Sequence, residues 1–225
     1  MPGRPIPLVT KEIYHIFNRG IDHRCTFTDK KAFIRTMKVI NFYRFAFPPT
    51  SLSSFLRLSR LRQSDILNNL QAKNKTLVEI ISYCLMPNHF HFLLKQNREN
   101  GIAKFMSNFQ NSYTRYFNIR QNRTGPLFLD QFKAIHLQND EQLLHISRYI
   151  HLNPYSSFIV KRLNEIELYP WSSFPEYLGK KKGFCNLDLV LSFFKKKEEY
   201  AKFVFDQAGY QRHLETIKHL TLEGS

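Results

Sequence analysis

Four short apolar runs, each rich in β-branched or aromatic residues, predict β-strands. The first covers residues 12–18 (EIYHIFN) and is closed by an Arg-Gly pair. Residues 77–85 and 89–96 flank Met86-Pro87-Asn88, a turn sequence that predicts a hairpin. Residues 127–136 predict the fourth strand.

Apolar residues at helical spacing predict three helices among these strands. The strongest pattern repeats every three or four positions and consists of Ile102, Phe105, Met106, Phe109, Tyr113, Tyr116 and Phe117. An earlier helix over about residues 30–43 can be capped by Asp29. Asn139 or Asp140 can cap the last one, which we expect to run to about Leu152 and to be stopped by Pro154.

The order strand–helix–strand–strand–helix–strand–helix is typical of an α+β, ferredoxin-like split βαβ sandwich with an antiparallel sheet and an added helix. A chain of 225 residues is long enough for one large domain, or for one domain with an appendage. We expect residues 1–178 to form the main domain, with residues 48–76 as a polar, basic and partly helical insertion. Residues 179–225 predict a helical C-terminal appendage.

The charge balance indicates a polyanionic partner. Lys and Arg number 33 against 18 Asp and Glu, which gives a net charge of +15. Such an excess most often accompanies nucleic acid binding, although a merely basic protein is the alternative. Only eight glycines are present, and no Gly-rich phosphate loop is among them.

The cysteines and the apolar runs predict a cytoplasmic, nucleoid-associated protein without a membrane partner. Cys25, Cys84 and Cys185 are odd in number and lack C-x-x-C spacing, so we expect them to be reduced. The N-terminal residues lack the apolar run of a signal peptide. No stretch approaches 18 uninterrupted apolar residues.

The most informative segment is residues 83–95 (YCLMPNHFHFLLK). Successive strand side chains point to opposite faces, so His89 and His91 share one face while Phe90 and Phe92 share the other. Two imidazoles at this spacing can present nitrogens to one divalent metal ion. A half-buried, hydrogen-bonded pair is the alternative.

The last predicted helix carries a second polar stripe, because residues four apart share a helix face. His145, Tyr149 and Asn153 form it. The amide oxygen of Asn153 is an acceptable third ligand for Mg²⁺ or Mn²⁺. Tyr149 suits phosphoryl transfer as a nucleophile, since a metal on the scissile phosphate neutralises charge and orients the attack. An ordinary tyrosine at the edge of the core is the alternative.

Several sequence blocks resemble one family. His89-Phe90-His91 is similar to the HUH motif of single-tyrosine transposases, and residues 148–154 (RYIHLNP) resemble a block of REP-associated tyrosine transposases, relatives of insertion-sequence transposases. Residues 14–20 (YHIFNRG), 125–128 (GPLF) and 171–173 (WSS) match that group in order. The resemblance covers roughly residues 10–178.

The resemblance implies a metal-dependent endonuclease and strand transferase acting on single-stranded DNA beside a hairpin. It implies that Tyr149 forms a covalent 5′-phosphotyrosine, that His89 and His91 bind Mg²⁺ or Mn²⁺, and that Asn153 completes the site. Asn153 is the least secure, because Pro154 is expected to push it out of helical geometry. The protein would be a monomer or a homodimer, since related insertion-sequence enzymes are dimers that can exchange the tyrosine helix.

The remaining histidines are expected to be structural or to contact DNA. We expect His151 to face away from Tyr149 and His15 and His136 to be core or DNA-contact residues. His145 could line the cleft, but we expect a packed surface residue. DNA contact needs a basic surface with aromatic partners. The candidate cations are Arg19, Arg24, Lys95, Lys104, Arg115, Arg120, Arg123 and Lys133.

Two other functions fit the same residues. A rolling-circle replication initiator or relaxase would use the same motif, but the compact layout with one catalytic tyrosine disfavours it. A DNA- or RNA-binding protein that has lost catalysis is the non-enzymatic alternative, and the intact His89, His91 and Tyr149 argue against it.

Overall fold

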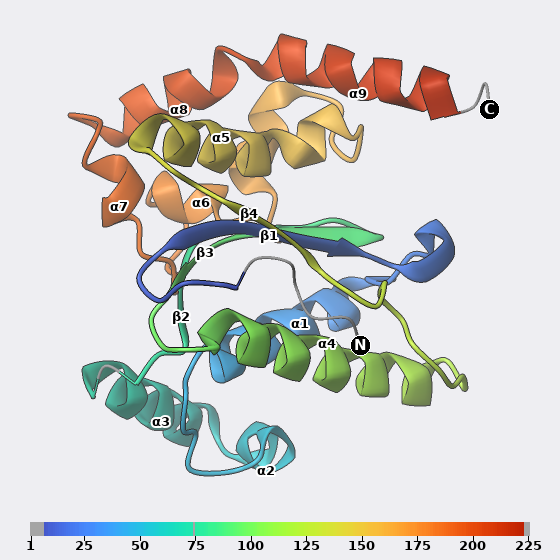
Figure 1. Ribbon diagram of the computed structural model, residues 1–225, viewed down its shortest axis with the longest axis vertical. Helices are drawn as coiled ribbons and strands as arrows, with labels where there is room; N and C mark the ends of the chain where they lie inside the picture. Colours follow the sequence, from blue (N-terminus) through green and yellow to red (C-terminus); the bar gives the residue numbers. More distant parts are fainter. Residues whose placement is uncertain (1–6, 74, 223–225) are drawn as a thin grey trace.

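The fold is a four-stranded antiparallel sheet between two helical layers (Figure 1). A computed structural model describes residues 7–73 and 75–222 of the chain, with side chains as far as residue 216. The ends of both expected domains, residues 1–6 and 223–225, lie outside the described residues. The sheet has the order β2-β3-β1-β4 and consists of β1 (Ile13–Arg19), β2 (Val78–Leu85), β3 (His89–Gln96) and β4 (Lys133–His136). The predicted α+β, ferredoxin-like class is confirmed.

The hairpin turn fixes where β3 begins and thus which face receives each of its side chains. The backbone N–H of Met86 donates to the carbonyl of His89 at 2.9 Å. From there β3 runs between β2 and β1, with Phe17 of β1 opposite His91. Since side chains alternate along β3, its histidines and its phenylalanines face different helical layers.

One layer consists of α1 (Lys30–Tyr43) and α4 (Gly101–Arg120). Asp29 caps α1 as predicted, accepting a hydrogen bond from the backbone of Ala32 at 2.9 Å. The apolar stripe of α4 packs against the phenylalanine face of β3, with ring centroids 5.1 Å apart for Phe90 and Phe109. The burial of these aromatic rings stabilises the packing of α4 against the phenylalanine face of the sheet.

The predicted insertion adds two helices outside this layer, α2 (Leu52–Arg57) and α3 (Arg60–Ala72). A short helix, η1 (Ile21–His23), follows β1 and lies outside the insertion. Phe55 of α2 is buried and packs at a tilt against Phe42 of α1, with ring centroids 4.8 Å apart. The insertion is thus attached to the core by a small number of apolar anchors.

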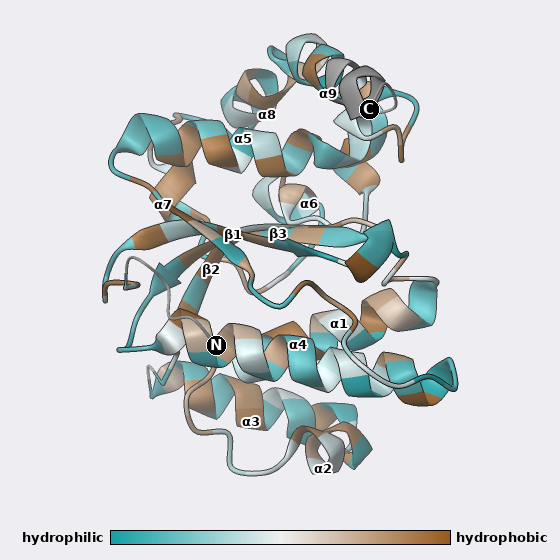
Figure 2. Cartoon of the chain, turned by 45° about the vertical axis from the view of Figure 1, so that its right-hand side comes forward, coloured by the Kyte–Doolittle hydropathy of each residue, from teal (hydrophilic) through white to brown (hydrophobic). Residues whose placement is uncertain are grey.

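The other layer is built from α5 (Asp140–Ser156) and the C-terminal helices. After α5 come η2 (Leu163–Leu168), α6 (Phe174–Tyr177), α7 (Asp188–Leu191), α8 (Lys197–Phe205) and α9 (Ala208–Leu222). Ile150 of α5 and Tyr200 and Val204 of α8 are buried in the same apolar cluster as Leu93 of β3. The C-terminal helices therefore share a core with α5 and the sheet, and Figure 2 shows the two helical layers on either side of the strands.

The fourth strand is shorter than the predicted run over residues 127–136. Only Lys133–His136 pairs as a strand with β1, and upstream Phe128 makes a single bridge to Gly20. The side-chain amide of Asn18 donates a hydrogen bond to the carbonyl of Leu129 at 2.9 Å. This bond holds the segment around Leu129 against β1 before the chain separates from it. Asp130, a residue type that strands disfavour, lies in the gap.

The prediction that Pro154 stops the last helix is wrong. Helix α5 continues to Ser156 with Pro154 inside it, so Asn153 keeps its place on the helix. The carbonyl of Tyr149, near the turn that the proline disturbs, accepts hydrogen bonds from the side chains of Asn153 and Gln211. Pro154 removes the helical hydrogen bond to the carbonyl of Ile150, and these two side chains bind the carbonyl one residue before it.

Candidate active site

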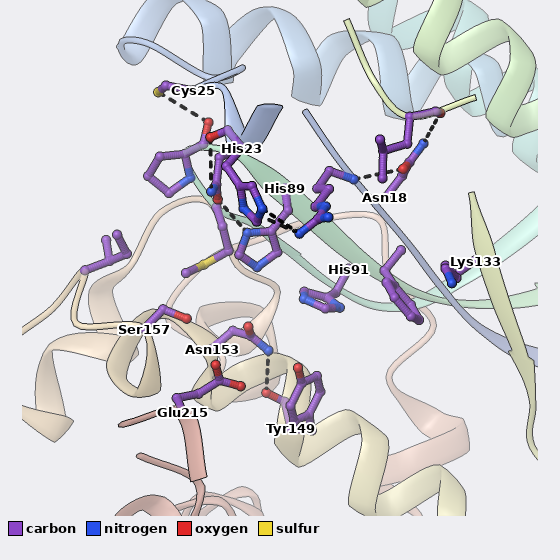
Figure 3. A pocket seen from close by; sticks show the side chains of 17 residues that line it. Asn18, His23, Cys25, His89, His91, Lys133, Tyr149, Asn153, Ser157 and Glu215 are labelled. Carbon is purple, nitrogen blue, oxygen red and sulfur yellow. Dashed lines mark hydrogen bonds between the residues drawn. The ribbon is translucent and has the colours of Figure 1, made fainter. Parts of the chain in front are cut away.

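A pocket of about 870 Å³ lies between the sheet and α5, and it gathers most of the predicted site (Figure 3). Strand β3 supplies His89 and His91 and α5 faces them, as the alternation along β3 and the four-residue spacing along α5 predict. Its lining includes the predicted residues Arg19, His89, His91, Lys133, Tyr149 and Asn153.

Two asparagine side chains lie beside His89. Its Nδ1 is 2.7 Å from the side-chain oxygen of Asn88, and Asn153 is near enough to favour the protonated ring. Burial lowers the pKa of His89 to about 4, although the Asn153 hydrogen bond and the charge of Glu215 act in the opposite direction. His89 is therefore neutral near pH 7, which is the form that binds metal ions.

His91 is oriented by a residue of the neighbouring strand. Its Nδ1 lies 3.0 Å from Nε2 of His15, and the two rings stack with centroids 5.2 Å apart. Both side chains are buried. With Nδ1 used in this way, Nε2 is the nitrogen of His91 that can act as a metal ligand.

Asn153 presents its amide oxygen toward His89. The amide nitrogen donates to the carbonyl of Tyr149 at 2.9 Å, which leaves Oδ1 as the atom that meets His89. If Nδ1 of His89 donates to Asn88, then Nε2 of His89 and Oδ1 of Asn153 are two acceptors that face one another. Such a pair is favourable when a cation or a proton lies between them.

The donor set suits a divalent ion with mixed nitrogen and oxygen preference. Among the described residues, no group of three or more His, Cys, Asp or Glu side chains is placed to hold a metal ion. His89 and His91 can supply two nitrogens and Asn153 one amide oxygen. This combination fits Mn²⁺ or Mg²⁺ better than a structural zinc site, which prefers a closed set of thiolates and imidazoles.

Tyr149 faces the histidines across the pocket from α5. Its ring is half-buried and meets His91 edge to face at 5.5 Å between centroids, and His15 at 5.9 Å. Its side chain lies beside the predicted metal ligands, as Figure 3 shows. A hydroxyl so placed can attack a phosphate bound in the pocket.

Helix α9 also contributes to the pocket, which the sequence did not reveal. Glu215 lines it, and its charge acts on His89. Gln211, one turn earlier, donates to the carbonyl of Tyr149 at 3.1 Å and to Ser156 at 3.2 Å. The predicted appendage thus supports the backbone of the candidate nucleophile.

The predicted DNA-contact cations fall in several places. Arg19 and Lys133 line the pocket, and exposed Arg24 follows η1. Arg115 and Arg123 line a second depression at the end of α4. Lys95 lies on β3, and Lys104 lies on α4 beside Phe47, 5.9 Å from the ring centroid.

Arg120 has a structural partner. It forms an ion pair with Asp29 at 2.6 Å, and its hydrogen bond with Asp29 holds the pKa of that carboxyl at about 2. The pair joins the end of α4 to the start of α1. Arg120 is thus a predicted DNA contact that already has a partner in the fold, as does Arg123, which donates to the side chain of Asn118 at 2.7 Å.

The other histidines divide as follows. His151 is buried on the opposite side of α5, as predicted, and His145 is an exposed residue beside Arg148 and Glu141. His136 is exposed and its Nε2 lies 2.7 Å from a carboxylate oxygen of Glu12, so it is not a core residue. His15 is a core residue, but it also touches both His91 and Tyr149, and this role was missed.

Two comparisons bear on identity, and a third finds nothing. Residues 57–153 match the model of the family described as "Transposase IS200 like". A solved structure described as "Structure of the REP associates tyrosine transposase bound to a REP hairpin" is similar in fold, with a TM-score of 0.50 and 11% identity over 80% of this chain and 87% of that one. No curated protein sequence matches.

The predictions about membrane spans and cysteines can be compared with the described residues. No helix among the described residues is long and apolar enough to cross a membrane. All three cysteines are free. The predicted cytoplasmic location stays a prediction.

Three of the blocks that carry the resemblance, on β1, β3 and α5, contribute residues to one pocket. The family match spans both the histidine pair and the tyrosine helix up to Asn153. The resemblance seen in the sequence is therefore confirmed: residues 57–153 match the model of the IS200-like transposases, and the fold is similar to that of a REP-associated tyrosine transposase.

Proposed function

We propose that this protein is a metal-dependent single-stranded DNA endonuclease and strand transferase that acts beside hairpin DNA. The observation that carries the proposal is the pocket in which Tyr149 of α5 meets His91 while His89 and Asn153 face one another. The hairpin substrate is inferred from the relative, whose structure is described as bound to a REP hairpin.

His89, His91 and Asn153 would hold the metal ion, which when bound supplies neutralisation of charge on the scissile phosphate. The Tyr149 oxygen would then form a bond to phosphorus while the bond to the 3′ oxygen breaks. The phenolic proton is given up, and the leaving 3′ oxygen takes up a proton. The product is a 5′-phosphotyrosine with a free 3′-hydroxyl, and the reverse attack by a hydroxyl would transfer the strand.

The cations at the rim would bind the DNA backbone. Arg19 and Lys133 line the pocket itself, so they can contact the phosphates next to the scissile one. Arg115 and Arg123 lie together at the end of α4 and can bind a duplex segment of the same substrate. Such contacts position the nucleic acid without reading its sequence.

The nucleophile can be tested with a labelled single-stranded hairpin substrate and Mn²⁺. Tyr149→Phe should abolish cleavage and leave DNA affinity unchanged, because it deletes one hydroxyl and keeps the ring. Tyr155→Phe, on the same helix, is the matched control and should cleave normally. A mass-spectrometric digest of the trapped complex should place the adduct on the Tyr149 peptide.

Two results would overturn the proposal in different ways. Full cleavage by Tyr149→Phe without any adduct would indicate hydrolysis by water. Tight hairpin binding by the wild type, with no cleavage of any single-stranded hairpin substrate tested with Mn²⁺, would favour a binding protein that has lost catalysis.

A further inference from the structure

His15 is a buried histidine whose polar contact is with a proposed metal ligand. It lies on β1 with 4% of its surface exposed, and its Nε2 is 3.0 Å from Nδ1 of His91. Its other nitrogen, Nδ1, is buried and has no hydrogen-bond partner among the residues that the structure describes. Within the described part of the chain, one of the two ring nitrogens of His15 thus has a hydrogen-bond partner and the other has none.

Stability alone does not explain a histidine at this place. The ring packs among other rings, with centroids 5.0 Å from Phe17 and 5.9 Å from Tyr149. A phenyl ring could make these contacts without burying an unpaired nitrogen, which is unfavourable. What a phenyl ring cannot supply is the hydrogen bond to His91.

We propose that His15 is a positioning residue that keeps Nε2 of His91 available to the metal ion. A metal-bound imidazole carries its proton on the other nitrogen and needs an acceptor for it. Nε2 of His15 is that acceptor, so it selects the Nδ1-protonated form of His91 and fixes the ring. Asn88 does the same for His89, through a 2.7 Å hydrogen bond to its Nδ1.

The pairing across the sheet explains why His15 can reach His91. Phe17 lies opposite His91 in the register of β1 and β3, and His15 is the next residue of β1 on the same face. The two rings therefore meet diagonally and stack at an interplanar angle of 22°. A rigid sheet holds this geometry better than a loop would.

The inference rests on the proposed function, because it presupposes a metal ion at His89 and His91. His15→Phe should lower Mn²⁺ affinity by about 10- to 100-fold, the usual cost of losing such an acceptor. His15→Gln places an amide near the position of Nε2 and should recover most of that affinity. Both should bind hairpin DNA normally without metal, and His15→Phe should unfold at the same temperature as the wild type or higher.

Isothermal titration with Mn²⁺, without DNA, gives the affinities. His136→Phe is the matched control, a strand histidine outside the pocket, and should bind Mn²⁺ like the wild type. Nitrogen-15 NMR of the histidines with Mg²⁺ bound should find the proton of His91 on Nδ1. If the phenyl ring prevents folding, His15→Leu replaces it as the variant without an acceptor.

Three outcomes separate this inference from the proposed function. If the double variant His89→Ala, His91→Ala keeps full Mn²⁺ affinity, the proposed metal site fails. If that variant loses Mn²⁺ while folded His15→Phe or His15→Leu binds it normally, the role of His15 is overturned and the metal site stands. If both lose affinity and His15→Gln recovers it, both are supported.

Discussion

His151 lies close to Tyr149 in the sequence but has a different environment from the histidines of the pocket. It follows Tyr149 by two positions but points to the opposite side of α5, where it is fully buried. Its Nε2 lies 2.8 Å from the hydroxyl of Ser173 and its Nδ1 2.7 Å from that of Tyr200. Burial lowers the pKa of His151 to about 3, so the ring is neutral in the folded protein.

This shift makes stability depend on pH. Between pH 6.5 and about 3 the unfolded chain protonates His151 and the folded chain does not, so acid favours unfolding. The full contribution is present above pH 6.5 and is lost as the pH falls. From pH 7 to pH 5, His151 should account for about 2 kcal/mol of the loss in unfolding free energy.

Urea unfolding of the wild type and of His151→Gln at both pH values measures this difference. The variant should lose about 2 kcal/mol less than the wild type over that interval. His15 and His89, whose pKa values are also lowered, contribute equally to both proteins and cancel. Equal losses in the two proteins would show that His151 is not the group responsible.

For single residues, the sequence predicted which side chains share a face when they lie on the same strand or the same helix. His89 and His91 share a face because strands alternate, and Tyr149 and Asn153 share one because helices repeat. His15 and Glu215 were missed, since their places depend on the register between β1 and β3 and on how α9 packs over α5. The periodicity of a single strand or helix predicts neither the strand register nor the packing of these helices.

Helix α5 is the element on which the candidate site depends, and its first turn is capped. The side-chain oxygen of Asn139 accepts a hydrogen bond from the backbone of Gln142 at 2.9 Å. The prediction offered Asn139 or Asp140 for this position, and the structure selects Asn139.

Removing the cap should weaken the helix without touching the pocket. Asn139→Ala should lower the free energy of unfolding by about 1 kcal/mol, the usual cost of losing such a cap. Asn139→Asp retains an oxygen acceptor and should be nearly neutral. Thermal unfolding of the two variants beside the wild type makes the comparison, and an equal loss in both would exclude capping as the cause.

Elements with strong internal patterns were predicted closely, and those shaped by neighbours were not. The expected helix over residues 30–43 and the expected strand over residues 89–96 match α1 and β3. The end of α5 was wrong, because tertiary packing, here the burial of Asn153, Pro154 and Ser156, can outweigh the single helical hydrogen bond that a proline removes. The shortened β4 has a similar origin in the contact of Asn18 with Leu129.

On the scale of the whole molecule, the candidate active-site pocket has two sides that come from different layers of the fold. The histidines belong to the central sheet and the tyrosine to the helical layer above it (Figure 1). The distance between them therefore depends on how firmly α5 is attached. Arg212 of α9 lies 4.2 Å from the ring centroid of Tyr155 and 4.3 Å from that of Phe158, and Gln211 and Tyr200 add hydrogen bonds to α5.

The covering of α5 by α8 and α9 has a consequence for how many chains one reaction needs. A chain could lend its tyrosine to another only by separating α5 from this buried apolar cluster. We therefore predict that each copy works in cis, with Tyr149 serving the histidines of its own chain. An equimolar mixture of Tyr149→Phe and His91→Ala should stay inactive on hairpin DNA, even after joint refolding, whereas recovered cleavage would reveal complementation between chains.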